Sequence, residues 1–187
     1  MSKQDVRRQI LEWRSGLPEA ARCRYGEAIA RRVIALEAFC RARTIGLYSP
    51  VRGEVPTASI FAAAVSCGKR VAYPRVCGAE DMEFVTVADL ADLQRGSFGV
   101  AEPVGKDTVA VSELDMLIMP GVAFSLSGWR LGYGKGYYDR LLCREKPAGP
   151  LAGICYEGQL VPALSGEAHD VPVQLIVTEA RVVFVQN

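Results

Sequence analysis

The sequence has one histidine, and its six cysteines are scattered without a C-x-x-C pair. Structural zinc sites need clustered cysteine and histidine ligands, so this composition argues against zinc. A chain of 187 residues can bury a core without disulfides, and the cysteine pattern does not indicate a disulfide scaffold. The single histidine, His169, is a candidate general base, although its position alone favours a structural role.

The sequence also lacks long apolar runs and a strong net charge. No stretch approaches the ~20 apolar residues that a membrane-spanning helix needs. Residues 1–14 are charged and have no apolar segment of the kind that secretory signals carry. A net charge of +1 gives no general reason to expect nucleic acid or an anionic membrane as a partner. We therefore expect a cytoplasmic monomer that acts on small molecules and binds neither nucleic acid nor a membrane.

The hydrophobic pattern alternates between helical and extended segments. Thr57 is a plausible N-cap for one of the helices. The pattern predicts helices at 3–14, about 18–43, 58–67, briefly at 88–94, and from about 137, and strands at 44–48, 69–74, 81–87, 115–120, 150–156, 174–179 and 181–186. The last two strands are expected to form a hairpin. This alternation predicts a single α/β domain over residues 1–187: a three-layer sandwich with a mostly parallel mixed sheet and helices on both faces. In such sheets ligands bind beyond the carboxyl ends of the strands, so the segments after Tyr48, Pro74 and Met119 are the expected walls of a site.

A glycine-rich segment follows the predicted strand at 115–120. It has glycines at positions 121, 128, 132, 134 and 136, carries Arg130 and Lys135, and leads into a predicted helix. Glycines let the backbone approach an anion, the helix N-terminus faces it, and the cations neutralise it. The spacing matches neither a Walker A loop nor a G-x-G-x-x-G fingerprint. A glycine-rich surface turn with a solvated Lys135 is the alternative, but the flanking cations and the upstream strand favour a phosphate-binding loop.

Five charged residues outside the loop each have two interpretations. Asp139 either complements the helix dipole or binds Mg²⁺ beside phosphates. Asp170 is either a turn residue or a second acid near that metal. Lys3 and Arg7 share a helix face that either contacts water or holds phosphates. Glu54 is either an exposed loop acid or an acceptor for a polar heterocycle.

Taken together, these segments resemble the 5-formyltetrahydrofolate cyclo-ligase family, also called methenyltetrahydrofolate synthetase. The resemblance covers nearly the whole chain. Its motifs are K-x-x-V-R at 3–7, Y-x-P at 48–50 with Glu54 downstream, F-G-V-x-E-P at 98–103, M-P-G-V-A-F at 119–124, R-L-G-Y-G-K-G-Y-Y-D at 130–139, H-D at 169–170 and I-V-T-E at 176–179.

The resemblance implies an enzyme that uses ATP and Mg²⁺ to convert 5-formyltetrahydrofolate to 5,10-methenyltetrahydrofolate, ADP and phosphate. It implies Asp139 and Asp170 as magnesium ligands, and Arg130 and Lys135 as catalytic cations. The residues implied to bind ATP are Lys3, Arg7, Arg130, Leu131, Gly132, Tyr133, Gly134, Lys135, Gly136, Tyr137 and Tyr138. The residues implied to bind the folate are Tyr48, Glu54, Tyr133, Gly134, Lys135, Gly136 and Tyr137.

In the implied reaction the γ-phosphate of ATP first activates the formyl oxygen, and N10 then attacks the formyl carbon. Phosphoryl transfer asks a protein chiefly for positioning and charge neutralisation. Ring closure is intramolecular, so no protein nucleophile is needed, and the chain offers no Ser-His-Asp or Cys-His arrangement. Two positions depart from the family pattern. Gln174 stands where relatives usually carry an acid, and Pro56 interrupts the segment after Glu54.

Two other functions fit parts of the pattern. One is a sugar-phosphate isomerase or a CoA-transferase-like enzyme on a similar sheet, for which Glu54 is the only loop acid available as base or nucleophile. The other is a non-catalytic binder of folate or nucleotide. Such a binder has no need of Asp139 and Lys135, whereas an ATP-using cyclase depends on them.

Overall fold

The computed structural model describes residues 2–78, 81–167 and 170–186. Its main element is an eight-stranded sheet in the order β13-β12-β10-β7-β1-β2-β3-β6. The five central strands, from β12 to β2, run parallel, and the strands outside them pair antiparallel. The bounds are β13 Val182–Phe184, β12 Leu175–Val177, β10 Leu151–Ile154, β7 Met116–Met119, β1 Thr44–Gly46, β2 Arg70–Cys77, β3 Asp81–Thr86 and β6 Thr108–Val109.

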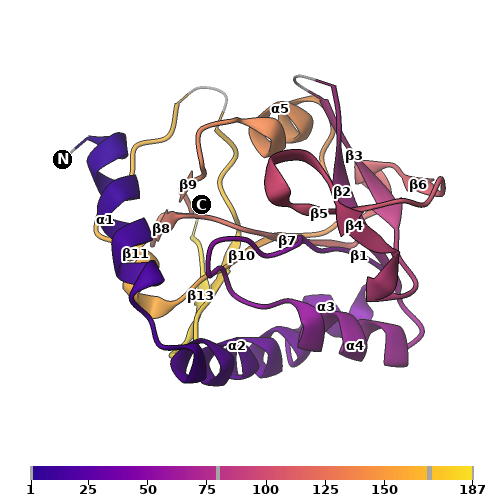
Figure 1. Cartoon of the computed structure of the whole chain (residues 1–187), viewed down its shortest axis with the longest axis horizontal. Helices are drawn as coiled ribbons and strands as arrows, with labels where there is room; N and C mark the ends of the chain where they lie inside the picture. Colours follow the sequence, from indigo (N-terminus) through magenta and orange to yellow (C-terminus); the bar gives the residue numbers. More distant parts are fainter. Residues whose placement is uncertain (1, 79–80, 168–169, 187) are drawn as a thin grey trace.

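Helices cover both faces of this sheet (Figure 1). On one face α2 (Glu19–Ile34), α3 (Glu37–Arg41) and α4 (Ala58–Ser66) pack against the inner strands in one buried cluster. On the other face α5 (Tyr137–Arg144) packs through Leu142 into a second cluster. The predicted three-layer α/β arrangement is therefore confirmed.

Two smaller sheets extend the molecule beyond these layers. The first has the order β11-β8-β9, with bounds Leu160–Val161, Ala123–Ser125 and Arg130–Leu131. The second pairs β4 (Leu93–Arg95) with β5 (Ala101–Pro103). Single-turn 3₁₀ helices lie at Leu90–Asp92, Ser97–Gly99, Val111–Glu113 and Glu157–Gln159.

The N-terminal helix α1 (Lys3–Ser15) lies against the smaller three-stranded sheet (Figure 1). Its start is fixed by a capping box, because the Ser2 hydroxyl accepts the Asp5 N–H and the Asp5 carboxylate accepts the Ser2 N–H. Val6 from the helix joins Ala123 and Leu131 in a separate buried cluster. This packing carries the first turn of α1, with its cations, to the strand that precedes the glycine loop.

Two predictions about helices were wrong. The helix expected at about 18–43 ends at Ile34, because Leu36 adopts an extended backbone that buries its side chain in the core before α3 begins. Thr57 is the N-cap residue of α4, as predicted, although its hydroxyl makes no cap hydrogen bond and donates to the Tyr48 carbonyl at 3.0 Å. The expected short helix at 88–94 is one 3₁₀ turn followed by β4. The hairpin of the last two strands is confirmed.

Candidate active site

A cavity of about 520 Å³ opens beyond the carboxyl ends of the central strands. Its walls include the segments that follow Tyr48, Pro74 and Met119, as the parallel order of the sheet predicts. Lys3 and Arg7 of the N-terminal helix, and Glu167 and Asp170 of the segment before β12, also line it. Every residue implied to bind ATP, folate or magnesium lines it: Lys3, Arg7, Tyr48, Glu54, Arg130, Leu131, Gly132, Tyr133, Gly134, Lys135, Gly136, Tyr137, Tyr138, Asp139 and Asp170.

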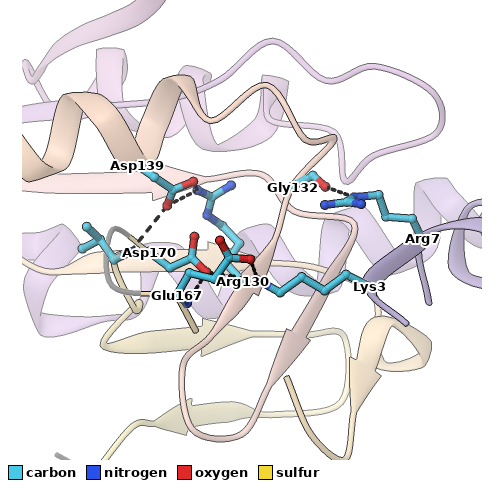
Figure 2. Close-up of polar contacts among 8 residues, drawn as sticks. Lys3, Arg7, Arg130, Gly132, Asp139, Glu167 and Asp170 are labelled. Atoms are coloured by element: carbon cyan, nitrogen blue, oxygen red, sulfur yellow. Dashed lines mark hydrogen bonds and ion pairs between the residues drawn. The ribbon is translucent and has the colours of Figure 1, made fainter. Parts of the chain in front are cut away.

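The glycine-rich loop connects β9 to the first turn of α5. Gly134 and Gly136 have φ angles of 94° and 67°, in the left-handed region that side chains disfavour, and Gly136 is the N-cap residue of α5. Arg7 crosses from α1 and donates from Nε to the Gly132 carbonyl at 2.7 Å (Figure 2). Lys135 is exposed, and its Nζ lies 5.1 Å from the centre of the Phe98 ring. The loop therefore presents backbone and cations to the cavity at a helix N-terminus.

Arg130 and Asp139 form the most buried ion pair of the site. Arg130 Nη2 donates to both carboxylate oxygens of Asp139, at 2.9 and 3.0 Å, and the two side chains are 5% and 17% exposed (Figure 2). The guanidinium also lies 5.5 Å from the Tyr138 ring centre. Its Nε is buried with no hydrogen-bond partner among the residues that the structure describes. A buried donor of this kind is suited to an oxygen of a bound anion.

A second charged group joins α1 to the segment before β12. Lys3 Nζ lies 2.8 Å from Glu167 Oε1 and 3.4 Å from Asp170 Oδ2 (Figure 2). The hydrogen bond from Lys3 to Glu167 raises the pKa of the lysine. Asp170 Oδ2 also accepts the Glu167 N–H at 2.8 Å. The segment reaches Asp139 as well, because the Val171 N–H points to Asp139 Oδ1 at 3.5 Å.

These contacts define what kind of metal site the carboxylates can form. Asp139 and Asp170 belong to the same wall of the cavity, with Arg130 between them (Figure 2). Within the described residues there is no group of three His, Cys, Asp or Glu that could hold a metal ion. Magnesium commonly takes one or two carboxylates and completes its shell with water and phosphate oxygens. The donor set therefore fits a magnesium ion shared with phosphates and does not fit a closed protein cage.

Glu54 also lines the cavity and is buried, so it is not the exposed loop acid that one interpretation expected. Its side chain is buried, Oε2 accepts the Val51 N–H at 2.9 Å, and Oε1 has no hydrogen-bond partner in the described part of the chain. Burial raises the pKa of this carboxyl, and the Val51 N–H and the Arg14 charge oppose the shift. Such a carboxyl can accept from, or donate to, a polar heterocycle.

Sequence reasoning missed several residues in or behind this cavity wall. Glu167 pairs with Lys3, and Arg14, buried behind the wall, contacts the Tyr133 hydroxyl. Arg52 lies 5.4 Å from the Tyr133 ring centre. Phe98, the first residue of the F-G-V-x-E-P motif, lines the cavity with a φ of 56°. Arg14 and Glu167 carried no motif, so only their long-range contacts reveal them.

Tyr48 lines the cavity, whereas Gln174 and Pro56 lie outside it. The Tyr48 hydroxyl donates to the Val55 carbonyl, so this residue offers its ring to the cavity. Gln174 does not line the cavity; its side chain accepts the Leu151 N–H at 2.7 Å, beside the sheet. Pro56 likewise lies outside this cavity and packs against Gly26 of α2. His169 lies outside the described residues.

The fold and the cavity define an α/β protein with one cavity that is lined by a glycine-rich loop, several cations and a buried acid. Comparison with known proteins narrows this class. The family model described as the 5-formyltetrahydrofolate cyclo-ligase family matches residues 1–179. A 5-formyltetrahydrofolate cyclo-ligase from Escherichia coli K12 is 31% identical over 163 residues, which cover 84% of this chain and 89% of that protein.

Solved structures agree with this comparison. The NMR structure of Aquifex aeolicus 5,10-methenyltetrahydrofolate synthetase is 37% identical and matches all of this chain and 94% of its own, with a TM-score of 0.88. A 5,10-methenyltetrahydrofolate synthetase from Mycoplasma pneumoniae is 28% identical over 96% of this chain and 99% of its own, with a TM-score of 0.80. The chain belongs to the 5-formyltetrahydrofolate cyclo-ligase family, so the resemblance found in the sequence is confirmed.

The buried carboxyl of Glu54 makes stability depend on pH in a defined direction. Its pKa in the folded protein lies above the ordinary 4.5, so the folded chain holds the proton more tightly than the unfolded chain. The resulting stabilisation is fully present below pH 4.5 and is lost as pH rises through the folded-state pKa. As pH rises, we expect the free energy of unfolding of Glu54→Gln to increase relative to that of the parent protein. Urea unfolding from pH 4 to pH 8 measures this difference. An unchanged difference between the two proteins across this range would contradict a raised pKa.

Proposed function

We propose that this chain catalyses the ATP-dependent conversion of 5-formyltetrahydrofolate to 5,10-methenyltetrahydrofolate, with release of ADP and phosphate. The observation that carries this proposal is one cavity that combines two kinds of lining. Cations and the glycine loop supply one kind, which we assign to the phosphates as the cationic end, and the buried Glu54 supplies the other, which we assign to the folate. The length of both named structural relatives matches this chain almost completely, which supports the same activity.

The cationic end suits a triphosphate. Lys3 and Arg7 from α1, with Arg130 and Lys135 from the loop, supply positive charge, and the N-terminus of α5 supplies backbone N–H groups. We assign the loop from Arg130 to Tyr138 to the phosphates. In this assignment Arg130 and Lys135 neutralise the charge that develops as the γ-phosphoryl group moves to the formyl oxygen.

The other end suits the folate. Glu54 meets the polar edge of the heterocycle, and Tyr48 and Tyr133 bound the same space with their rings. The loop from Tyr133 to Tyr137 lies between the two ends and contacts both substrates in this proposal. Once the formyl oxygen is phosphorylated, N10 attacks the formyl carbon, the carbon–oxygen bond breaks, and phosphate leaves with the proton that N10 gives up. The protein contributes alignment to this step, because the nucleophile belongs to the substrate.

We assign Asp139 and Asp170 to a magnesium ion that is shared with the phosphates. When bound, this ion neutralises phosphate charge and orients the γ-phosphoryl group. The support is the position of both carboxylates on the cationic wall and the bridge between their segments through the Val171 N–H. Both carboxylates already contact cations, Asp139 with Arg130 and Asp170 with Lys3.

Three further proposals concern the chain as a whole. We propose that residues 1–187 form one domain, since α1 and β13 pack on the same continuous structure. We propose a monomer, since residues of α1, the glycine loop and the segment before β12 together line the cavity. We propose a cytoplasmic enzyme, since all six cysteines are free thiols, as reducing compartments favour. In the described part of the chain, no helix is long and apolar enough to cross a membrane.

The activity is tested by incubating the protein with 5-formyltetrahydrofolate and Mg²⁺, with and without ATP, and following the methenyl chromophore. We expect growth of the chromophore only with ATP. Lys135→Ala should lower kcat by at least about 100-fold, as loss of a group that stabilises transition-state charge does, with an unchanged Tm. Lys146→Ala is the matched control, because this lysine is exposed and lies outside the cavity. ATP-independent turnover, or a Lys135→Ala variant as fast as the control, would contradict the proposal.

The magnesium assignment is tested by calorimetry without any turnover. We expect the parent protein to bind ATP at least about tenfold more tightly with Mg²⁺ than with a chelator, since the ion offsets repulsion between phosphates and carboxylates. Asp170→Asn and Asp139→Asn should both reduce this ratio. Asp89→Asn, an exposed acid away from the cavity, serves as the control. If both cavity variants keep the parent ratio, the carboxylates do not hold the metal.

A further inference from the structure

Arg14 is a fully buried arginine that none of the assigned roles uses. It lies in the last turn of α1, and its exposed fraction is 0%. A guanidinium carries five N–H donors and a permanent charge, so its burial costs free energy unless partners accept those donors. The partners of Arg14 therefore indicate why the fold keeps it there.

The acceptors of Arg14 come from three different walls of the cavity. Nε donates to the Arg52 carbonyl at 3.1 Å, and Nη1 donates to the Gly121 carbonyl at 3.4 Å. Nη2 donates to the Tyr133 hydroxyl, and the guanidinium carbon lies 5.9 Å from the centre of that ring. One side chain thus connects the loop before Glu54, the end of β7 and the glycine loop.

The hydrogen-bond partners of Arg14 carry no charge. Its acceptors are two backbone carbonyls and a phenol, and no carboxylate of the described residues forms an ion pair with it. Its charge still acts on Glu54, whose pKa it lowers against the larger effect of burial. The phenol of Tyr133 stays neutral, since burial raises its pKa to about 12.

We propose that Arg14 is a positioning residue for the folate: it holds the Tyr133 ring against the 51–54 loop and so fixes Tyr133 beside Glu54 in the cavity wall. This assignment rests on the proposed function. Arg14 acts through Tyr133, since each of its three nitrogens donates to a protein group. The phosphate end is anchored separately, by the Arg7 contact to Gly132 and by the Arg130–Asp139 pair. Disturbing Arg14 therefore changes folate binding more than nucleotide binding.

The test is a double-mutant cycle between Arg14→Lys and Tyr133→Phe, read as the KM for 5-formyltetrahydrofolate and the Kd for ATP with Mg²⁺. We expect each single variant to raise the folate KM about tenfold, as loss of one charge-assisted hydrogen bond does, and to change the nucleotide Kd less than about threefold. The double variant should raise the KM no further, because both changes break the same contact. Arg8→Lys is the matched control: Arg8 is on the same helix, its side chain is 72% exposed, and its only ion-pair partner among the described residues is Asp5.

The outcomes separate this assignment from the proposed function. A KM that rises about 100-fold in the double variant, as the product of two independent effects, overturns the assignment. If Arg14→Lys does not fold, the Tyr133→Phe variant, which removes only one oxygen atom, tests the assignment by itself. An unchanged folate KM in that variant overturns the assignment. Wild-type protein without ATP-dependent turnover overturns the proposed function and this assignment with it. Wild-type turnover with a raised folate KM and a preserved Tm in Tyr133→Phe supports both.

Discussion

The hydrogen bond from Arg7 to the Gly132 carbonyl joins residues that are 125 positions apart and brings the N-terminal helix to the glycine loop. The cavity depends on this approach, because α1 carries Lys3 and Arg7 to the same wall as Arg130 and Lys135. The contact is possible because α1 packs through Val6 on the small sheet from which the loop emerges. An apolar contact of the helix thus determines where its charged face lies.

The cations of this wall are held in different ways. Arg130 and Asp139 are both shielded from solvent, so their attraction is weakly screened and the pair fixes the start of α5. Lys3 and Glu167 are more exposed, and a pair of that kind contributes little stability. The wall therefore combines Arg130, a cation held in place, with Lys3, a cation that can exchange its partners easily. This combination suits a ligand that must enter, react and leave as two products.

Much of the fold and the site could be predicted from the sequence, for physical reasons that particular elements make clear. The strands at 44–46 and 116–119 are apolar runs bounded by turn residues, so their pattern predicts them. The glycine loop is recognisable because it combines closely spaced glycines with cations. Because parallel strands end at one edge, the segments after them had to meet. Short strands such as β9 and β11 could not be predicted, since two residues show no periodicity.

The unpredicted site residues share a different cause. Arg14 and Glu167 owe their positions to contacts across the fold. In the sequence alone, Arg14 is one arginine among several in a charged helix, and Glu167 is an ordinary loop acid. Glu54 was recognised as a candidate, but its burial follows from the way the 51–54 loop folds over Arg14. The break between α2 and α3 also results from tertiary packing, because the burial of Leu36 interrupts the helix. No proline or glycine at this point predicted the interruption.

The central claim is that a triphosphate lies against the main chain between Gly132 and Tyr138. Amide hydrogen exchange, measured with and without ATP and Mg²⁺, tests this claim most directly. The account predicts slower exchange at the backbone amides of this loop and of the first turn of α5 when nucleotide is present. Nucleotide binding that slows exchange elsewhere and leaves these amides unchanged would contradict it.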